Sequence, residues 1–169
     1  GWVGAGGNPN IVHTNGVFSG GGPLNSQSGN QYLDIANSSA DFWQNFTFTC
    51  SARAYFSGYF SVRENTGSNG RIDIYSVDAL NNLTLVASSN QLNMPSTMNV
   101  WYYAAGTTIL SPGNYRFQIS MGDFSNFDNA CFSFDDLCIN AVDDPTVTLA
   151  SGITPVVALN VLGIDTLNG

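Results

Sequence analysis

Hydrophobic and polar residues alternate along most of the first 140 residues, the pattern of a strand with one buried and one solvent-facing side. Residues 71–75 (RIDIY) and 115–119 (YRFQI) show this alternation most clearly. Runs of this kind predict strands at 31–36, 43–49, 53–62, 71–77, 83–88, 98–104, 114–121 and 131–139. No longer segment shows the period of 3.6 residues that is typical of an amphipathic helix.

Polar turn segments separate the predicted strands. Residues 65–70 (NTGSNG), 81–82 (NN) and 111–114 (SPGN) carry the turn-forming residue types. Several short strands joined by polar turns are typical of an antiparallel β-sandwich, so we predict an all-β fold of the jelly-roll kind. The Gly-rich first 30 residues are predicted to form ordered loops with one or two short strands.

The texture of the chain changes after residue 140. Residues 1–140 are predicted to form the β-sandwich module, and residues 141–169 to form an extended C-terminal connector. Residues 141–145 (AVDDP) have the composition of a linker, because Pro145 favours an extended backbone at Asp144. Two further extended runs follow at 146–150 and 155–162, and they could begin a following repeat or pair with a sheet edge in the same or a neighbouring copy.

Charge and composition exclude several classes of protein. The 169 residues carry four Lys and Arg against twelve Asp and Glu, for a net charge of −8. Four scattered arginines in a negative field are a poor match for a phosphate polymer, so no nucleic-acid partner is expected. No apolar run approaches the length that a bilayer requires, so no membrane insertion is expected either. The Asn, Ser, Thr and Gly surface favours an extracellular or cell-surface location.

The three cysteines allow at most one disulfide within the chain. Cys50, Cys131 and Cys138 include no closely spaced pair, and with the single His13 they make a poor zinc site. A structural disulfide is the preferred interpretation. Cys50 with Cys131 is the favoured pairing, although the sequence does not settle it.

Three segments together resemble one fold family. Gly1-Trp2 opens the chain, residues 29–35 (GNQYLDI) follow, and residues 132–139 (FSFDDLCI) close the module. This order resembles the galactose-binding-like jelly rolls, which include many carbohydrate-binding modules. The resemblance implies the β-sandwich fold for residues 1–140, and it implies a ligand class only weakly.

The C-terminal segment carries a second resemblance. Residues 141–144 (AVDD) and 160–165 (NVLGID) are similar to the opening of cadherin-like or immunoglobulin-like repeats in large bacterial adhesins, of the Bacteroidetes type. This likeness implies one module and a connector from a long surface protein, with neighbouring repeats or copies of the same chain as partners.

The sequence argues against an enzyme. Glycoside hydrolysis uses two carboxylates across the scissile bond, and the one glutamate, Glu64, lies beside a predicted turn. His13 lies in a Gly-rich segment without a nucleophile elbow. We therefore expect no catalytic residues.

Oxygen-bearing side chains suggest a structural Ca²⁺. Asp123 and Asp128 belong to the dense run 122–129 (GDFSNFDN), and Ca²⁺ takes six to eight oxygen ligands. In the family that the chain resembles, a structural Ca²⁺ often takes a carboxylate from the last strand, which implies Asp135 or Asp136. The alternative is that these aspartates cap turns or lie on a solvated face.

Exposed aromatic rings are the candidate sugar contacts, because they stack on the apolar face of a pyranose. In residues 100–104 (VWYYA), strand alternation places Trp101 and Tyr103 on one side and Tyr102 on the other. Trp101 and Tyr103 are therefore the predicted ligand-binding residues, whereas Trp2 and Trp43 are assigned to the core.

Together these observations predict a non-catalytic adhesion module of a secreted surface protein, with glycan binding and structural Ca²⁺. The alternative is a purely structural stalk repeat or a filament subunit joined by strand exchange.

Overall fold

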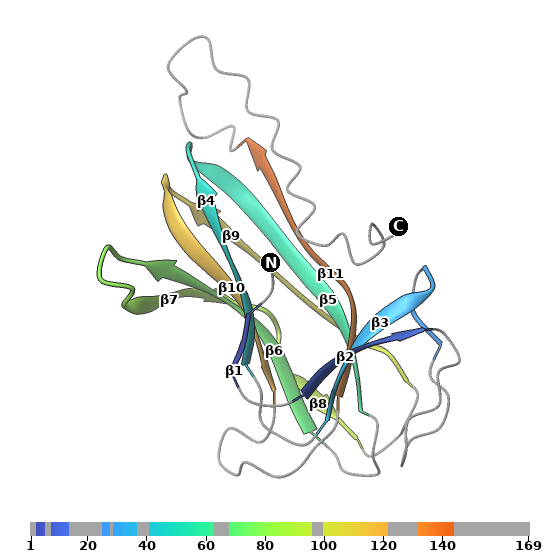
Figure 1. Ribbon diagram of the computed structural model, residues 1–169. Coiled ribbons are helices and arrows are strands. Elements are labelled where there is room, and N and C mark those ends of the chain that lie inside the picture. Colours follow the sequence, from blue (N-terminus) through green and yellow to red (C-terminus); the bar gives the residue numbers. More distant parts are fainter. Residues whose placement is uncertain are drawn as a thin grey trace.

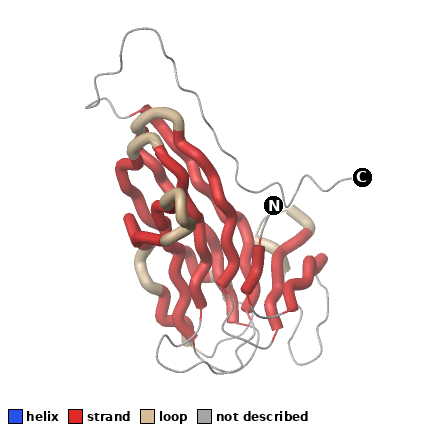
Figure 2. The backbone as a smooth tube through the Cα atoms, turned by 60° about the vertical axis from the view of Figure 1, so that its left-hand side comes forward, coloured by secondary structure: helices blue, strands red, loops and turns tan. Residues whose placement is uncertain are grey.

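The computed structural model shows two antiparallel β-sheets packed face to face (Figure 1). It describes residues 3–5, 8–13, 25–27, 29–36, 41–62, 68–95, 100–121 and 132–143. Figure 2 shows that these residues form strands and connecting loops. Among them there is no helix long and apolar enough to cross a membrane.

The first sheet has the order β1-β4-β10-β6-β7, with β8 pairing to β6. Its strands are β1 (Val3–Ala5), β4 (Asp41–Phe48), β10 (Gly113–Met121), β6 (Ser68–Val77), β7 (Leu83–Ser88) and β8 (Leu92–Met94). The second sheet has the order β2-β3-β11-β5-β9. Its strands are β2 (Asn8–His13), β3 (Gln31–Ala36), β11 (Phe132–Asp143), β5 (Ala52–Val62) and β9 (Tyr102–Leu110). Because the chain passes repeatedly from one sheet to the other, the fold is a jelly roll, as the sequence predicted.

The core lies between the inner faces of the two sheets. Alternate residues of each strand point inward, and the apolar ones pack against the facing sheet. The largest side chains that are fully buried are Phe56, Phe60, Phe117, Ile72, Ile74, Leu110, Ile119, Leu137 and Ile139. Burying such a side chain contributes about 1.5–3 kcal/mol to folding. The odd–even pattern of the clearly alternating strands, such as 71–75 and 115–119, therefore matches the residues that are buried.

Most predicted strands are confirmed, and β9 differs most from its prediction. β3 and β7 match the predicted ranges, and where one or two short strands were expected in the first 30 residues, the structure has two, β1 and β2. β9 runs from Tyr102 to Leu110 instead of over 98–104, so the prediction ended too early. Pairing with β5 carries β9 onward, from Phe60↔Tyr102 to Ala52↔Leu110.

The last strand extends past the predicted module boundary. Residues 141–143 were predicted to begin the connector, but they continue β11 and pair with residues 54–52 of β5. Strand β5 is long enough to pair with these residues, so they stay in the sheet although their composition is that of a linker. The two extended runs at 146–150 and 155–162 lie outside the described residues.

The favoured disulfide is not formed. Cys50 and Cys138, the two cysteines that the structure describes, are both free thiols. Cys50 precedes β5, whereas Phe132, the first residue of β11, pairs with Val62 at the far end of β5. Burial raises the pKa of the Cys138 thiol above its ordinary value, and the Asp136 charge adds to this effect. Cys131 lies outside the described residues.

Candidate functional site

The two predicted ligand-binding aromatics lie in different surroundings. The indole N–H of Trp101 donates to the backbone oxygen of Asn25 at 2.8 Å, and its ring meets buried Tyr32 edge to face at 5.9 Å. Tyr103 is 51% exposed, while Tyr102 packs against the core, so the predicted alternation is confirmed for this pair. Trp101 therefore anchors the loop at Asn25, and Tyr103 belongs to an exposed surface.

The predicted calcium ligands are described only in part. Asp123 and Asp128 lie outside the described residues, and Asp135 is described only by its backbone. Asp136 is exposed, with a φ of 48°, at the register shift of β11 between Asp135 and Cys138. Within the described part of the chain, no three His, Cys, Asp or Glu side chains cluster as metal ligands. Calcium binding remains a prediction.

The outer face of the first sheet carries an aromatic residue that the sequence analysis assigned to the core. Phe42, Phe46 and Phe48 of β4 point inward, so Trp43 and Asn45 point outward. The guanidinium of Arg116 lies over the Trp43 ring, 4.7 Å from its centre. The assignment of Trp43 to the core is wrong, because Trp43 is an odd number of residues from Phe42, Phe46 and Phe48, and successive side chains of a strand point to opposite faces. Trp2 lies outside the described residues.

Pairing between strands brings further polar side chains beside Trp43. Trp43 is opposite Gln118, and Asn45 is opposite Arg116, in the β4–β10 pair. The Nε of Arg116 donates to the Oδ1 of Asn45 at 3.3 Å. We call this surface the Trp43 face. Its members are Trp43, Asn45, Thr47, Asp73, Tyr75, Asn114, Arg116 and Gln118.

A buried carboxylate organises one side of the Trp43 face. Asp73 of β6 is 0% exposed although it lies on the outer side of its sheet. The Nε of Arg71 lies 2.8 and 2.9 Å from its two oxygens, forming a salt bridge. The hydroxyls of Ser88 and Ser120 donate to it at 2.6 and 3.3 Å. A buried charge with this many donors fixes the side chains around it.

The network extends from Asp73 toward Trp43. Buried Gln118 donates from its Nε2 to the Ser120 hydroxyl at 3.4 Å. The Tyr75 hydroxyl lies 3.5 Å from the Asp73 carboxylate, at the limit of a hydrogen bond. Residues from β6, β7 and β10 therefore hold one another in place within the Trp43 face and beside it.

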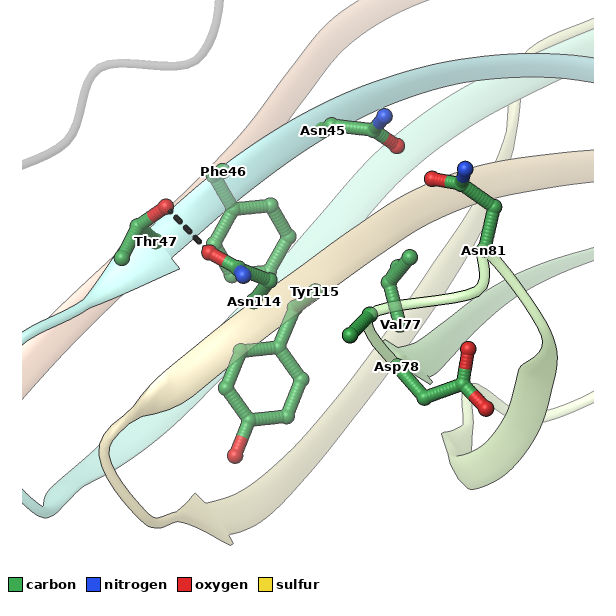
Figure 3. Close-up of a pocket in the computed structure, with 9 residues that line it drawn as sticks. Asn45, Phe46, Thr47, Val77, Asp78, Asn81, Asn114 and Tyr115 are labelled. Carbon is green, nitrogen blue, oxygen red and sulfur yellow. Dashed lines mark hydrogen bonds between the residues drawn. The ribbon is translucent and has the colours of Figure 1, made fainter.

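A cavity of about 370 Å³ continues the Trp43 face at its other end (Figure 3). Strands β4 and β10, the end of β6 and the turn between β6 and β7 supply its lining. The lining residues are Asn45, Phe46, Thr47, Val77, Asp78, Ala79, Asn81, Asn114 and Tyr115. The Thr47 hydroxyl donates to the Oδ1 of Asn114 at 2.8 Å. Because Asn45 both lines the cavity and accepts from Arg116, the cavity and Trp43 form one continuous surface.

The wall of the cavity is a tightly hydrogen-bonded turn. The Asp78 carboxylate accepts from the backbone N–H groups of Leu80 and Asn82, both at 2.8 Å, and from the Asn82 side chain at 2.7 Å. These bonds, the Asn82 side chain first, lower the pKa of Asp78. Asn81 in this turn has a φ of 65°, which asparagine tolerates better than most residues. The turn therefore presents an ionised carboxylate and an amide to the cavity.

Tyr115 closes the inner side of the cavity. Its ring stacks on Phe46 with centroids 5.7 Å apart, and its hydroxyl donates to the backbone oxygen of Ser111 at 2.7 Å. Burial raises the pKa of this hydroxyl. Tyr115 is therefore a neutral structural residue, and the polar chemistry of the cavity comes from its amide, hydroxyl and carboxylate side chains.

Sequence reasoning missed the Trp43 face, although part of its signal is local. Alternation around Phe42 and Phe46 places Trp43 and Asn45 outward, and alternation around Tyr115 and Phe117 does the same for Arg116. Nothing local indicates that Arg116 and Trp43 meet, because that contact depends on the register of β4 with β10.

Comparison with known proteins places this fold. No protein-family model matches the sequence, and no curated protein matches it either. The chain is similar to the CBM22-1 xylan-binding domain of Paenibacillus barcinonensis Xyn10C, with a TM-score of 0.56 and 15% identity, over 85% of this chain and 87% of that one. It is similar to TmCBM61 in complex with beta-1,4-galactotriose, with a TM-score of 0.54 and 12% identity, over 83% and 88% of the two chains.

A third structure is similar over a part of its length. It contains the CBM22-1 and GH10 modules of Clostridium thermocellum xylanase 10B complexed with xylohexaose, with a TM-score of 0.57 and 14% identity. The match covers 89% of this chain and 27% of that one. At these identities the likeness shows the fold alone: this chain has the jelly-roll β-sandwich fold that carbohydrate-binding modules also have.

Proposed function

We propose that this chain is a non-catalytic module that binds a polysaccharide on the Trp43 face. The observation that carries the proposal is the Arg116 guanidinium held over the Trp43 ring and bonded to Asn45, beside a cavity of amides and hydroxyls. The jelly-roll fold, which glycan-binding modules also use, supports it.

The chemistry of the Trp43 face suits a sugar chain. The Arg116 guanidinium covers one side of the Trp43 ring, so a pyranose would place its apolar C–H face on the other side of the indole, while amide and guanidinium groups bond to its hydroxyls. Asn45 uses its Oδ1 for Arg116, so its amide N–H groups can donate to a ligand. Asn114 and Asn81 supply further amide groups in the cavity.

Preorganisation adds to affinity. Binding is weakened when flexible side chains must be ordered, and each such side chain costs about 0.5–1.5 kcal/mol. Here Arg116 is held by Trp43 and Asn45, and Gln118 by Ser120. The ligand therefore meets side chains whose orientations are already fixed.

The comparisons suggest the glycan class. Two of the similar structures are complexes, one with beta-1,4-galactotriose and one with xylohexaose. We propose a neutral, extended β-linked glycan, because the Trp43 face continues for roughly 13 Å along β4 from Trp43 to Thr47. That span exceeds one pyranose ring, so several sugars of one chain would contact it.

We further propose a role in adhesion at the cell surface, without catalysis. The carboxylates of the face are engaged in structure: Asp73 is buried among its donors, and Asp78 is bound within its own turn. Glycoside hydrolysis needs two carboxylates that flank the bond. This engagement argues for binding rather than turnover.

The test is affinity electrophoresis and calorimetry with soluble β-1,4-xylan and β-1,4-galactan. We expect the polysaccharide to retard the wild-type protein. We expect the affinity of Trp43→Ala to be lower by about tenfold or more. The matched control is Val100→Ala, a substitution at a residue that is 40% exposed and outside the Trp43 face. Equal binding by Trp43→Ala, with an unchanged circular dichroism spectrum, would overturn the proposal. Release of reducing ends from either polysaccharide would overturn its non-catalytic part.

A further inference from the structure

The outer face of the second sheet carries two exposed tyrosines and a half-buried one that the Trp43 face does not use. Tyr55 and Tyr59 lie on β5, and Tyr103 lies directly opposite Tyr59 on β9. The rings of Tyr59 and Tyr103 are 4.9 Å apart at their centres and tilted by 46°. Tyr103 is 51% exposed and Tyr55 is 48% exposed. Large aromatic rings left this accessible on a sheet face commonly mark an interaction surface.

Tyr55 is flanked by groups that bind hydroxyls. In the β11-β5-β9 order, Asn140 lies opposite Tyr55 on one side and Thr107 on the other. Both flanking residues are exposed. The Thr107 hydroxyl donates to the backbone oxygen of Ala54 at 3.1 Å, so its oxygen can accept from a ligand. An aromatic ring between an amide and a hydroxyl is the arrangement that a pyranose requires.

The space between the two aromatic positions is shallow. Tyr55 and Tyr59 are four residues apart on one side of β5, which corresponds to roughly 13 Å. Between them lies Ser57, opposite Ala105 of β9, and both side chains are small. A ligand that contacts both positions must therefore be extended and must present apolar faces repeatedly, as a sugar chain does.

The charge of this surface favours the same ligand. Along the outer sides of β5 and β9, Arg53 is the one charged residue among those described, and β11 adds Asp135 opposite Tyr59. With few charges, and those of opposite sign, this surface gives a charged polymer little to bind. It suits a neutral glycan.

We infer that Tyr55, Tyr59 and Tyr103 form a second glycan-binding site, on the opposite side of the sandwich from the Trp43 face. The two sheets turn their outer faces in opposite directions (Figure 1). One module therefore contacts two separate glycan chains and bridges them. The inference shares the ligand class of the proposed function, but it rests on a different set of residues.

The experiment compares four proteins by affinity electrophoresis in gels with β-1,4-xylan or β-1,4-galactan. They are the wild type, Trp43→Ala, Tyr55→Ala with Tyr103→Ala, and the triple variant. We expect residual retardation in Trp43→Ala and none in the triple variant. Light scattering should show that the wild type aggregates soluble xylan or galactan. Trp43→Ala and the double tyrosine variant, which each lack one site, should not. Tyr55→Phe with Tyr103→Phe is the matched control, because it keeps both rings and should retain at least half of the retardation.

The outcomes separate the two sites. If Trp43→Ala alone abolishes the retardation and the double tyrosine variant binds as the wild type does, the second site is overturned. The proposed function then still stands. Retardation lost in the double tyrosine variant and kept in Trp43→Ala supports the second site and overturns the Trp43 face. If neither polysaccharide retards the wild type, both binding sites are overturned. Sedimentation of the wild type alone completes the test: self-association that the double tyrosine variant abolishes would make this surface an interface between copies, against our inference.

Discussion

Arg116 and Trp43 lie on neighbouring strands, and the guanidinium of the one lies 4.7 Å from the ring centre of the other. Such a cation–π contact contributes about 0.5–1 kcal/mol at a partly exposed site. Together with the bond to Asn45 it fixes the orientation of both groups.

Replacing Arg116 by methionine tests this contact. Methionine keeps an apolar stem and removes the charge and the donors. We expect Arg116→Met to lower the free energy of unfolding by about 1 kcal/mol, as measured by urea denaturation. The control is the same substitution in a Trp43→Ala background, where the loss should be smaller because the ring is gone. An equal loss in both backgrounds would show that the Trp43 contact is not responsible.

Asp73 should be the polar residue on which stability depends most. Asparagine is similar in size, but its amide N–H groups would face the donors of Arg71 and Ser88. We expect Asp73→Asn to cost about 1–3 kcal/mol, because buried donors lose their acceptor. Asp78→Asn, at an exposed turn, is the control and should cost less. Equal urea midpoints for the two variants would contradict the role assigned to Asp73.

Gly106 lies where the sheets leave no room for a side chain. A Cβ there would overlap the ring of Phe56 and lie 3.1 Å from the backbone oxygen of Ser88. We expect Gly106→Ala to cost about 1–3 kcal/mol by overpacking. At Gly113 a Cβ would have ordinary contacts, with Tyr115 at 3.5 Å or more, so Gly113→Ala should be nearly neutral. Thermal unfolding of the two variants provides the comparison.

The Asp78 turn should make stability depend on pH. Hydrogen bonds from Asn82 lower the pKa of Asp78 below its ordinary value of 3.8. The unfolded chain therefore binds a proton before the folded one does, so the stabilisation is present above pH 3.8 and is lost as the pH falls through the lower, folded pKa. We expect the difference in unfolding free energy between the wild type and Asp78→Ala to be constant near neutral pH and to shrink below pH 3.8. A difference that grows on acidification would have the wrong sign.

Calcium binding is tested by thermal unfolding in EDTA and then in millimolar Ca²⁺. A ligand that binds only the folded state at a hundredfold excess over its dissociation constant adds about 2.7 kcal/mol. We expect Ca²⁺ to raise the melting temperature and Asp136→Asn to reduce that rise. Mg²⁺ at the same concentration is the control. Equal melting temperatures in EDTA and Ca²⁺ would remove the predicted site.

Local pattern was sufficient for the strands and their inner faces. Phe46, Ile72 and Ile74 alternate with more polar neighbours, and every one of them is buried. Alternation is a property of the strand itself, so it can be read without knowing the partner. The end of β9 was not predicted, because its last residues are held by pairing with β5.

The candidate site depended on pairing that no local pattern contains. Asn45 and Arg116 are 71 residues apart in sequence, and Asp73 and Ser120 are 47 apart. A shift of one residue in either register would send these side chains to opposite faces. The sequence by itself determined that the chain forms a β-sandwich and, apart from Trp43, which side of the clearly alternating strands fills its core, because burial follows a period of two along each strand. The tertiary structure decided which outward residues meet, because that depends on how strands distant in sequence are aligned.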